Sequence, residues 1–388
     1  MKRKKKNCMK GKFNITKRLA ALPVLAAACL SLTGCFESEI YQPRLPMLFS
    51  SYAAGKSSEI LATRADGSFI PAGTTTLPDT SSFGVFAWYQ EGVPLSGDPA
   101  EWNDGGWSPS YMFNQRVDFD GTNYSYSPLR YWPSNEENTI SFWAYYPYSA
   151  YVEANTGSVQ FYEDAACTRA YVKGSTTGLP VAKCTIPIDP ASQYDLLFDS
   201  FAQKDKTYGN CAPVEGVVPF TFRHAFSLVE FEIIEGTGAV INSMEITNLY
   251  WNGVCTDVKN LTWASQGGLA NFSIAHVTVE SSTICRLLMI PQDLTVSNPT
   301  LTINYDITFA SSDPNHPEPI DYKGNNGSVA LVSAKNEDGV SSAGITAWES
   351  GKHYIYKIRA GFERIEFEEV IESSEDWITG NNNISVPQ

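Results

Sequence analysis

The chain has 388 residues, with 28 basic and 42 acidic side chains, 43% hydrophobic residues and 13% aromatic residues. That hydrophobic content is typical of a globular protein and excludes a disordered chain, while the acidic balance argues against nucleic acid and anionic membranes as partners. About 350 residues remain beyond the N-terminal segment, more than one core comfortably holds, which predicts two domains.

The first predicted element is a secretory signal peptide over residues 1–34. Residues 2–18 hold nine basic side chains, and no acidic residue precedes Glu37. The apolar run from Leu19 to Leu32 is about 14 residues long, whereas a membrane-spanning helix needs about 20. A basic head followed by such a run is typical of export. Without the signal, 19 basic residues face 42 acidic ones, a net charge of −23.

The signal ends in the tetrapeptide LTGC, whose last residue is Cys35. This resembles the bacterial lipobox, in which the bond before the cysteine is cut and the thiol is acylated. We therefore expect a lipoprotein anchored to a membrane through Cys35, because two or three acyl chains hold a protein stably there. An ordinary signal peptide with a chance cysteine is the alternative.

The residues between Cys35 and Arg64 form a first segment with its own apolar clusters. Apolar residues are scattered between Ile40 and Tyr52, and a second apolar cluster directly precedes Thr63 and Arg64. A plain tether would be more polar and more uniform than this segment.

Beyond residue 65 the dominant hydrophobic period is two, which indicates strands with one buried and one solvated face. Alternation is clearest in residues 226–234, 301–309 and 354–358, and residues 83–89 and 139–146 are short aromatic runs. Asp-Gly and Asn-Gly turn signals separate these runs. The predicted fold class is therefore all-β, with β-sandwich domains.

The polar, turn-rich stretch 203–216 is the predicted join between the two domains. It divides the chain into an N-terminal β-sandwich domain over residues 65–210 and a C-terminal β-sandwich domain over residues 211–388.

We find no constellation for catalysis, cofactor binding or metal binding, so we expect no enzyme. The four histidines, His224, His276, His316 and His353, lack the spacing of metal pairs and are predicted to be structural. The segment around Asp120 has alternating oxygen ligands but lacks the late glutamate of a calcium loop, so a β-turn is favoured there.

Five cysteines remain beyond Cys35: Cys167, Cys184, Cys211, Cys255 and Cys285. Their number is odd, so at least one thiol stays unpaired, and both disulfides and buried free thiols remain open.

Aromatic side chains gather between residues 102 and 132: Trp102, Trp107, Tyr111, Phe113, Tyr124, Tyr126, Tyr131 and Trp132. Such rings stack on sugars, and they also fill sandwich cores. A lipid-anchored surface glycan-binding protein is therefore the alternative function.

The mature chain also resembles the fimbrillins, the type V pilins of Bacteroidales, in pieces spread along its length. The matching pieces are the lipobox at Cys35 and residues 62–65, 83–87, 194–198, 222–228, 289–292 and 348–354. The resemblance implies two tandem transthyretin-like β-sandwich domains in an outer-membrane lipoprotein that becomes part of a surface fimbrium serving adhesion. Expected partners are other pilin subunits, identical or different, and a host glycan or protein receptor.

The resemblance further implies that an Arg-specific protease cuts between the lipid and the first domain. Residues 35–64 would then be a lipidated propeptide that contains an N-terminal strand. The cut releases this strand, and a strand of the next subunit fills the apolar groove that remains. A sheet that lacks one strand is a strong site for β-augmentation, and head-to-tail pairing that does not close makes a filament.

Arg64 is the candidate cleavage site because an apolar cluster precedes it and an Asp-Gly turn follows it. Arg44, close to Pro46, is a poorer candidate, and an ordinary exposed linker arginine is the alternative at residue 64. The candidate donor-strand residues lie near the C-terminus: Ile365, Phe367, Val370, Ile384 and Val386. Residues 379–383 are too polar to fill a groove, so a tip subunit that need not donate and an anchor that keeps its lipid are alternatives to a stalk subunit.

Overall fold

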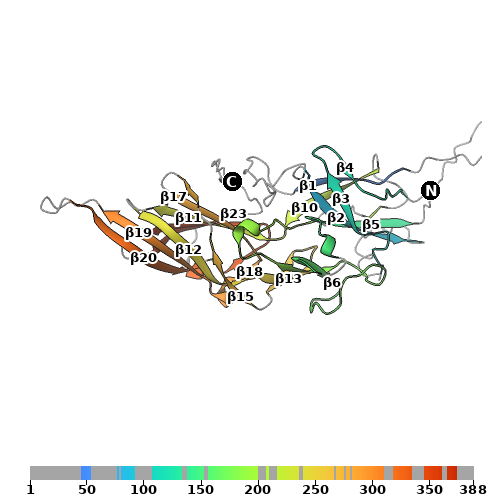
Figure 1. The fold of residues 1–388 in the computed structure, drawn as a ribbon. Coiled ribbons are helices and arrows are strands. Elements are labelled where there is room, and N and C mark those ends of the chain that lie inside the picture. The colour runs from blue at the N-terminus through green and yellow to red at the C-terminus, as the bar shows by residue number, and fades with distance from the viewer. Residues whose placement is uncertain are drawn as a thin grey trace, which may run out of the picture. The chain divides into compact units, whose positions relative to one another are not determined.

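The computed structural model describes residues 45–53, 77, 80–91, 107–132, 138–152, 156–199, 207–208, 216–235, 239–265, 268–274, 277–279, 282–309, 318–333, 345–360 and 365–373. All of them belong to one of the two units of the chain, Arg44–Gln388. Strands dominate this part of the chain (Figure 1), so the all-β prediction is confirmed. No helix among the described residues is long and apolar enough to cross a membrane.

The first sheet has eight strands and collects them from both sides of the predicted domain join. Its order is β1 (Leu48–Ala53), β10 (Val217–His224), β8 (Leu197–Asp199), β5 (Thr139–Tyr146), β2 (Ser82–Gln90), β3 (Met112–Phe119) and β4 (Tyr124–Ser125), with β9 (Thr207–Tyr208) beside β5. Neighbours run antiparallel except β1 and β10, which are parallel.

The predicted aromatic runs form β2 and β5, which are buried on both faces. All eight residues of β5 are buried, and in β2 Phe86 and Trp88 face one core while Phe83 and Val85 face another. Strands covered on both sides read as near-continuous apolar runs. This double burial explains why alternation fails in these two segments.

A four-stranded sheet covers one face of the first sheet. Its order is β14 (Thr262–Ser265), β13 (Asn252–Asp257), β7 (Val181–Thr185) and β6 (Val159–Tyr162). Phe161 of β6 and Cys255 of β13 join Phe86 and Trp143 in the shared core. Together the two sheets form the first sandwich.

The second sandwich packs two further sheets around a core of its own. One has the order β16 (Val277–Val279), β17 (Ser282–Met289), β11 (Ser227–Glu235), β22 (His353–Ala360) and β23 (Ile365–Ser373), and the other has β15 (Leu269–Ser273), β12 (Ala239–Tyr250), β19 (Thr300–Phe309) and β20 (Ile320–Ala330) (Figure 1). In β19 the predicted alternation is confirmed, because Leu301 and Ile303 are buried in this core while Thr302 is not. In β11, Val229 and Phe231 are buried there as expected, but Glu230, predicted to be solvated, is buried as well.

Short elements complete the described chain. A small sheet pairs β18 (Gln292–Asp293) with β21 (Ala347–Trp348). The helices are η1 (Ala150–Val152), η2 (Pro190–Ser192), α2 (Leu294–Ser297) and η4 (Leu331–Ser333).

The strand pairing does not follow the predicted join at residues 210 and 211. Strands β10, β13 and β14 all come after residue 211, yet they pair with strands of the first sandwich. The predicted turn-rich stretch 203–216 therefore separates two strands of one sheet, β8 and β10. Turn residues mark chain reversals, and nothing in them distinguishes a reversal within a domain from a boundary between two.

Candidate functional site

The first strand, β1, is the candidate functional element. It comes from the predicted propeptide and forms the edge of the first sheet, beside β10. It pairs in parallel with β10 from Leu48 opposite Val217 to Ala53 opposite Phe222. The predicted strand within residues 35–64 is therefore present in the fold, as a sheet partner of residues more than 160 positions later.

The residues that precede β1 pair with a second segment, residues 130–132, which follows β4 in the chain. Met47 donates its N–H to the carbonyl of Arg130 at 2.9 Å, and Trp132 donates to the carbonyl of Leu45 at 3.0 Å. An isolated bridge joins Pro46 to Tyr131. Residues 45–53 therefore connect two stretches of backbone that do not pair with each other in the described structure.

Phe49 anchors this segment in an aromatic core. Its side chain is 4% exposed. Its ring stacks on Phe220 with centroids 5.6 Å apart and lies 5.2 Å from Tyr126 and 6.1 Å from Phe142. Met47 is fully buried in the same cluster. Burial of such side chains stabilises by about 1.5–3 kcal/mol each, so the first segment fills a groove that downstream residues build.

Two tyrosines tie the segment to the opposite edge of the sheet. The hydroxyl of Tyr126 donates to the carbonyl of Met47 at 3.0 Å, and Ser51 Oγ lies 2.7 Å from the hydroxyl of Tyr124. Burial raises the pKa of Tyr126 to about 12, so its hydroxyl stays protonated and able to donate. The strand is thus held by side-chain hydrogen bonds as well as by its backbone.

Gly216 permits the close approach of the first segment to β10. Its φ is +74°, and a Cβ there would lie 2.7 Å from the carbonyl oxygen of Pro46. Any other residue would push the entering chain away. Beside this point, Leu45, Leu48, Leu129 and Tyr131 are each 39–44% exposed.

The predicted processing residues flank this strand. Cys35 and Arg64 lie outside the described residues, as does Arg44. Strand β1 ends at Ala53, eleven positions before Arg64, so a cut after Arg64 would separate the whole strand from the rest of the chain.

The predicted donor-strand residues fall into two groups. Ile365, Phe367 and Val370 lie in β23, the edge strand that pairs antiparallel with β22. Ile384 and Val386 lie outside the described residues.

The aromatic cluster predicted as a glycan site does not form a single surface. Phe113 and Trp107 pack against the core between the two sheets of the first sandwich. Trp132, with Tyr111, Tyr124 and Tyr126 packed beside it, belongs to the core on the opposite face of the first sheet. Trp102 lies outside the described residues. Core packing accounts for these rings, and Tyr131, at 41% exposed, is the member of the described cluster that lies at the surface. A single exposed ring weakens the case for a sugar platform.

The remaining candidate residues have structural partners. Asp120 Oδ1 accepts hydrogen bonds from the N–H groups of Thr122 and Asn123 at 2.9 and 2.7 Å, which confirms the predicted turn. His224 lies 3.0 Å from the buried carboxylate of Asp195. His276 and His316 lie outside the described residues, in which no group of three or more potential metal ligands occurs.

The described cysteines are free thiols. Cys184, Cys255 and Cys285 are buried, and burial raises the pKa of each thiol above its usual value. Cys167 is partly exposed, and burial raises its pKa too. Such thiols are poor nucleophiles. Cys211 lies outside the described part of the chain.

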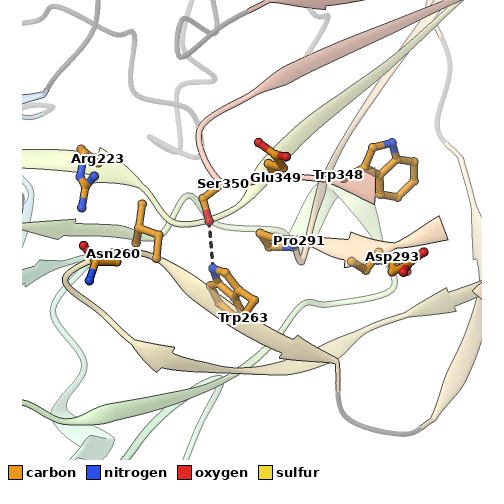
Figure 2. A pocket seen from close by; sticks show the side chains of 10 residues that line it. Arg223, Asn260, Trp263, Pro291, Asp293, Trp348, Glu349 and Ser350 are labelled. Carbon is orange, nitrogen blue, oxygen red and sulfur yellow. Dashed lines mark hydrogen bonds between the residues drawn. The ribbon is translucent and has the colours of Figure 1, made fainter. Parts of the chain in front are cut away.

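A pocket of about 440 Å³ lies where the chain passes from β10 to β11 (Figure 2). Its lining includes Arg223, Trp263, Asp293, Glu349 and Ser350. The indole N–H of Trp263 donates to Ser350 Oγ at 2.9 Å, and Ser350 Oγ donates to the carbonyl of Ala225 at 2.9 Å. Glu349 pairs with Lys352 and Asp293 accepts from the N–H of Thr295, so these polar groups have structural partners and the pocket is a joint between segments.

Sequence reasoning missed this joint and the partner of the first strand. The signal for the joint was present in the stretches 222–228, 289–292 and 348–354, which were noted separately and meet here. No local pattern links residues 48–53 with 217–222, because parallel pairing between distant segments has no sequence period of its own.

Comparisons with known proteins place these features in context. A family model described as fimbrillin-like matches residues 63–377, so β1 precedes the matched region. The fimbrium subunit Fim1C of Phocaeicola vulgatus is 25% identical over 135 residues, or 34% of this chain; the match spans 32% of Fim1C, about a third of its length. A crystal structure of a fimbrial protein from Bacteroides vulgatus aligns over 86% of this chain and 99% of its own, with a TM-score of 0.54 at 16% identity. At that identity the likeness concerns the fold alone.

Proposed function

Because this chain belongs to the fimbrillin-like family, we propose that it is a structural subunit of a cell-surface fimbrium with a role in adhesion. The family match covers most of the chain, and the all-β fold is similar to that of a fimbrial protein. A structural rather than a catalytic role is consistent with side chains that form turns, cores and joints.

The proposed maturation has two steps. Export and acylation of Cys35 anchor the protein in the outer membrane, and an Arg-specific protease then cuts after Arg64. The cut leaves β1 held by hydrogen bonds and apolar contacts alone, with no covalent link to the sandwich that it completes.

The position of Phe49 is the observation that carries this proposal. Phe49, upstream of the candidate cut, joins Met47 in a core whose remaining aromatic members lie downstream, among them Phe142 and Phe220. Loss of β1 would uncover these rings together with the unpaired backbone edge of β10. A groove of that kind favours addition of a strand from another subunit.

Two C-terminal segments are the candidate donors. Donation of Ile365, Phe367 and Val370 would require β23 to leave β22, with which it pairs along its length. Donation of Ile384 and Val386 would leave that pairing intact. The two choices differ in the residues that a truncation removes, so they are separable by experiment.

The test is cleavage in solution of a secreted form in which Cys35→Ser prevents acylation. An Arg-specific protease should produce an N-terminus at Ala65, release the peptide that contains β1, and yield oligomers that resist detergent. Arg64→Ala should remain monomeric. Truncation after Ser373 keeps β23 and removes Ile384 and Val386, so loss of oligomers would assign the donor to the last residues.

A cut protein that stays monomeric would rule out a polymerising stalk subunit. If the cut protein retains the β1 peptide after dilution, cleavage does not open the groove and the proposed maturation is wrong.

A further inference from the structure

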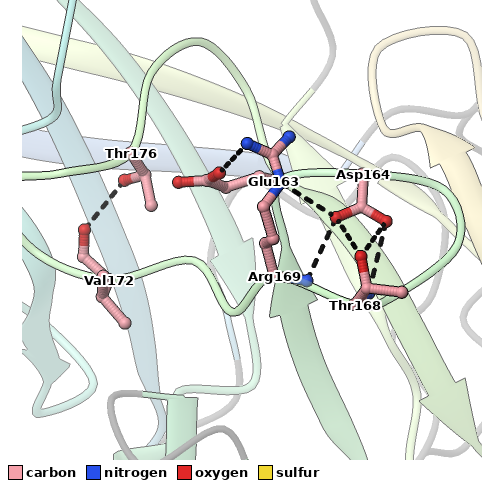
Figure 3. A network of polar contacts seen from close by, with 6 residues as sticks. All are labelled: Glu163, Asp164, Thr168, Arg169, Val172 and Thr176. Carbon is pink, nitrogen blue, oxygen red and sulfur yellow. Dashed lines mark hydrogen bonds and ion pairs between the residues drawn. The ribbon is translucent and has the colours of Figure 1, made fainter.

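An exposed arginine lies in the hairpin loop that follows β6, and two carboxylates bind it (Figure 3). Arg169 Nη1 lies 3.0 Å from Glu163 Oε2, and Nε lies 3.4 Å from Asp164 Oδ2. The side chain of Arg169 is 68% exposed, whereas those of Glu163 and Asp164 are 19% and 23% exposed. The guanidinium therefore lies at the surface but is already paired.

The backbone around Arg169 is fixed as well. Its N–H donates to Asp164 Oδ2 at 3.1 Å, and its carbonyl accepts from the N–H of Glu163 at 2.9 Å. On the other side of the peptide bond, Ala170 forms a bridge with Tyr162, and Tyr171 donates to the carbonyl of Phe161 at 3.0 Å. The bond between Arg169 and Ala170 is thus flanked by hydrogen bonds to β6 and its loop.

Asp164 organises the rest of the loop. It accepts from the N–H and hydroxyl of Thr168 at 3.2 and 3.1 Å, and its own carbonyl accepts from Cys167 N–H at 2.9 Å. Desolvation opposes the charged carboxylate, but the hydrogen bonds from Thr168 and Arg169 outweigh it, so the pKa of Asp164 lies below its usual value. The carboxylate is charged at neutral pH.

Stability alone is a weak reason for this arrangement, because exposed ion pairs contribute about 0–1 kcal/mol. Exposed loop tips are preferred sites of proteolysis, and a trypsin-like enzyme needs the arginine side chain free to enter its specificity pocket. Two other exposed arginines, Arg116 and Arg359, lie within strands β3 and β22. Arg169 differs from them because it lies in a loop, where two carboxylates hold its side chain.

We propose that Glu163 and Asp164 protect the bond after Arg169 from Arg-specific cleavage. The protease that opens the first sandwich at Arg64 would then leave the hairpin after β6 intact. The biological part of this inference rests on the proposed function. The resistance of the bond between Arg169 and Ala170 is a property of the loop itself and is measured with trypsin.

The experiment follows trypsin cleavage of the full-length Cys35→Ser chain by mass spectrometry, with rates at Arg169 and Arg64 compared in each sample. The wild type should be cut after Arg64 with Arg169 intact. Glu163→Gln with Asp164→Asn should raise the relative rate at Arg169 at least 10-fold, because the guanidinium loses both charged partners and the loop loses one of the two acceptor oxygens of Asp164. Asp120→Asn, which alters a turn that is likewise held by an aspartate side chain but does not contact Arg169, should leave that ratio unchanged.

High salt provides a second measurement that needs no substitution. At about 1 M salt the Debye length is about 3 Å, so cleavage at Arg169 of the wild type should rise relative to Arg64. Wild-type cleavage at Arg169 as fast as at Arg64, or an unchanged ratio both in the double variant and in high salt, would overturn the inference. Absence of cleavage at Arg64 would instead count against the proposed function.

Discussion

Glu230 is a buried carboxylate that contacts Arg286 and His353. Its side chain is 6% exposed, and its Oε2 lies 2.7 Å from Arg286 Nε and 3.2 Å from His353 Nε2. The three residues lie on the neighbouring strands β17, β11 and β22. Desolvation raises the pKa of Glu230, but hydrogen bonds and charge from His353 and Arg286 outweigh it, and the net pKa is lowered. A buried group of this kind is costly to leave unpaired.

Glu230→Gln should destabilise the fold by about 3 kcal/mol at pH 7, because it leaves a buried cation without its carboxylate. A lowered folded-state pKa contributes stability that is present above the unfolded value, near 4.5, and is lost as pH falls through the folded value. The difference in unfolding free energy between wild type and variant should therefore shrink below pH 4.5. Urea unfolding at pH 7 and at pH 3.5 measures it.

Glu232→Gln is the matched control, since Glu232 is a less buried carboxylate on the same strand. It should change stability by less than about 0.5 kcal/mol. An equal effect of both substitutions would contradict the ion-pair explanation.

A substitution of Phe49 tests most directly whether its aromatic contacts anchor β1 to the sandwich. Phe49→Ala should cost about 3–5 kcal/mol if the core cannot collapse around the change, and it should free β1 preferentially. We expect hydrogen exchange to speed up at residues 48–53 more than at β19. Leu48→Ala, on the same strand but 39% exposed, should change exchange little. Equal effects of the two variants would show that Phe49 does not anchor the strand.

At the scale of elements, the first segment, residues 45–53, holds the backbone around Arg130 and should protect it from proteolysis. The carbonyl of Arg130 accepts from Met47, and the neighbouring Trp132 donates to Leu45. Removal of the first segment takes both bonds away, so a processed subunit with an empty groove should be cut by trypsin after Arg130. The uncut protein and an assembled subunit should both resist. Resistance of the empty subunit would mean that the groove closes on itself.

Hydrophobic alternation in the sequence predicted many strands correctly, but it did not predict which strands pair with each other. Residues 301–309 alternate, and β19 buries Leu301, Ile303, Tyr305 and Ile307 as expected. The segment at 365–371 is a strand, as its brief alternation indicated. Alternation sets which face of a strand is buried, not which sheet it joins. The assignment of β10, β13 and β14 to the first sandwich depends on long-range packing, and β1 depends on a parallel pairing across the chain.

The candidate site was partly accessible from the sequence. A strand in the propeptide was expected from the fimbrillin resemblance, and the structure places β1 there. Its anchor residue and its neighbours could not be predicted, because Phe220 and Tyr126 are separated from Phe49 by many elements.

At the scale of the whole molecule, the joint around Ser350 links segments of both sandwiches. Ala225 lies between β10 and β11, and Trp263 belongs to β14. Ser350→Ala would leave the Trp263 N–H and the Ala225 carbonyl without this partner, at a cost of about 1–3 kcal/mol. We expect a lower melting temperature by calorimetry. Thr302→Ala, which removes an exposed hydroxyl pair with Ser328, should have little effect.

The proposed assembly depends on an exchange in which one strand leaves and another enters. The subunit that loses β1 gains a site for a partner strand, and repetition of this contact extends a filament because it does not close. Cleavage also separates the subunit from its predicted lipid at Cys35. One event would therefore release the protein from the membrane and open it for assembly.

The most direct test is intact mass and N-terminal sequencing of the protein recovered from fimbriae at the cell surface. The account predicts an N-terminus at Ala65, no acyl group and no residue of β1. Recovery of a chain that begins at an acylated Cys35 and retains Phe49 would contradict it.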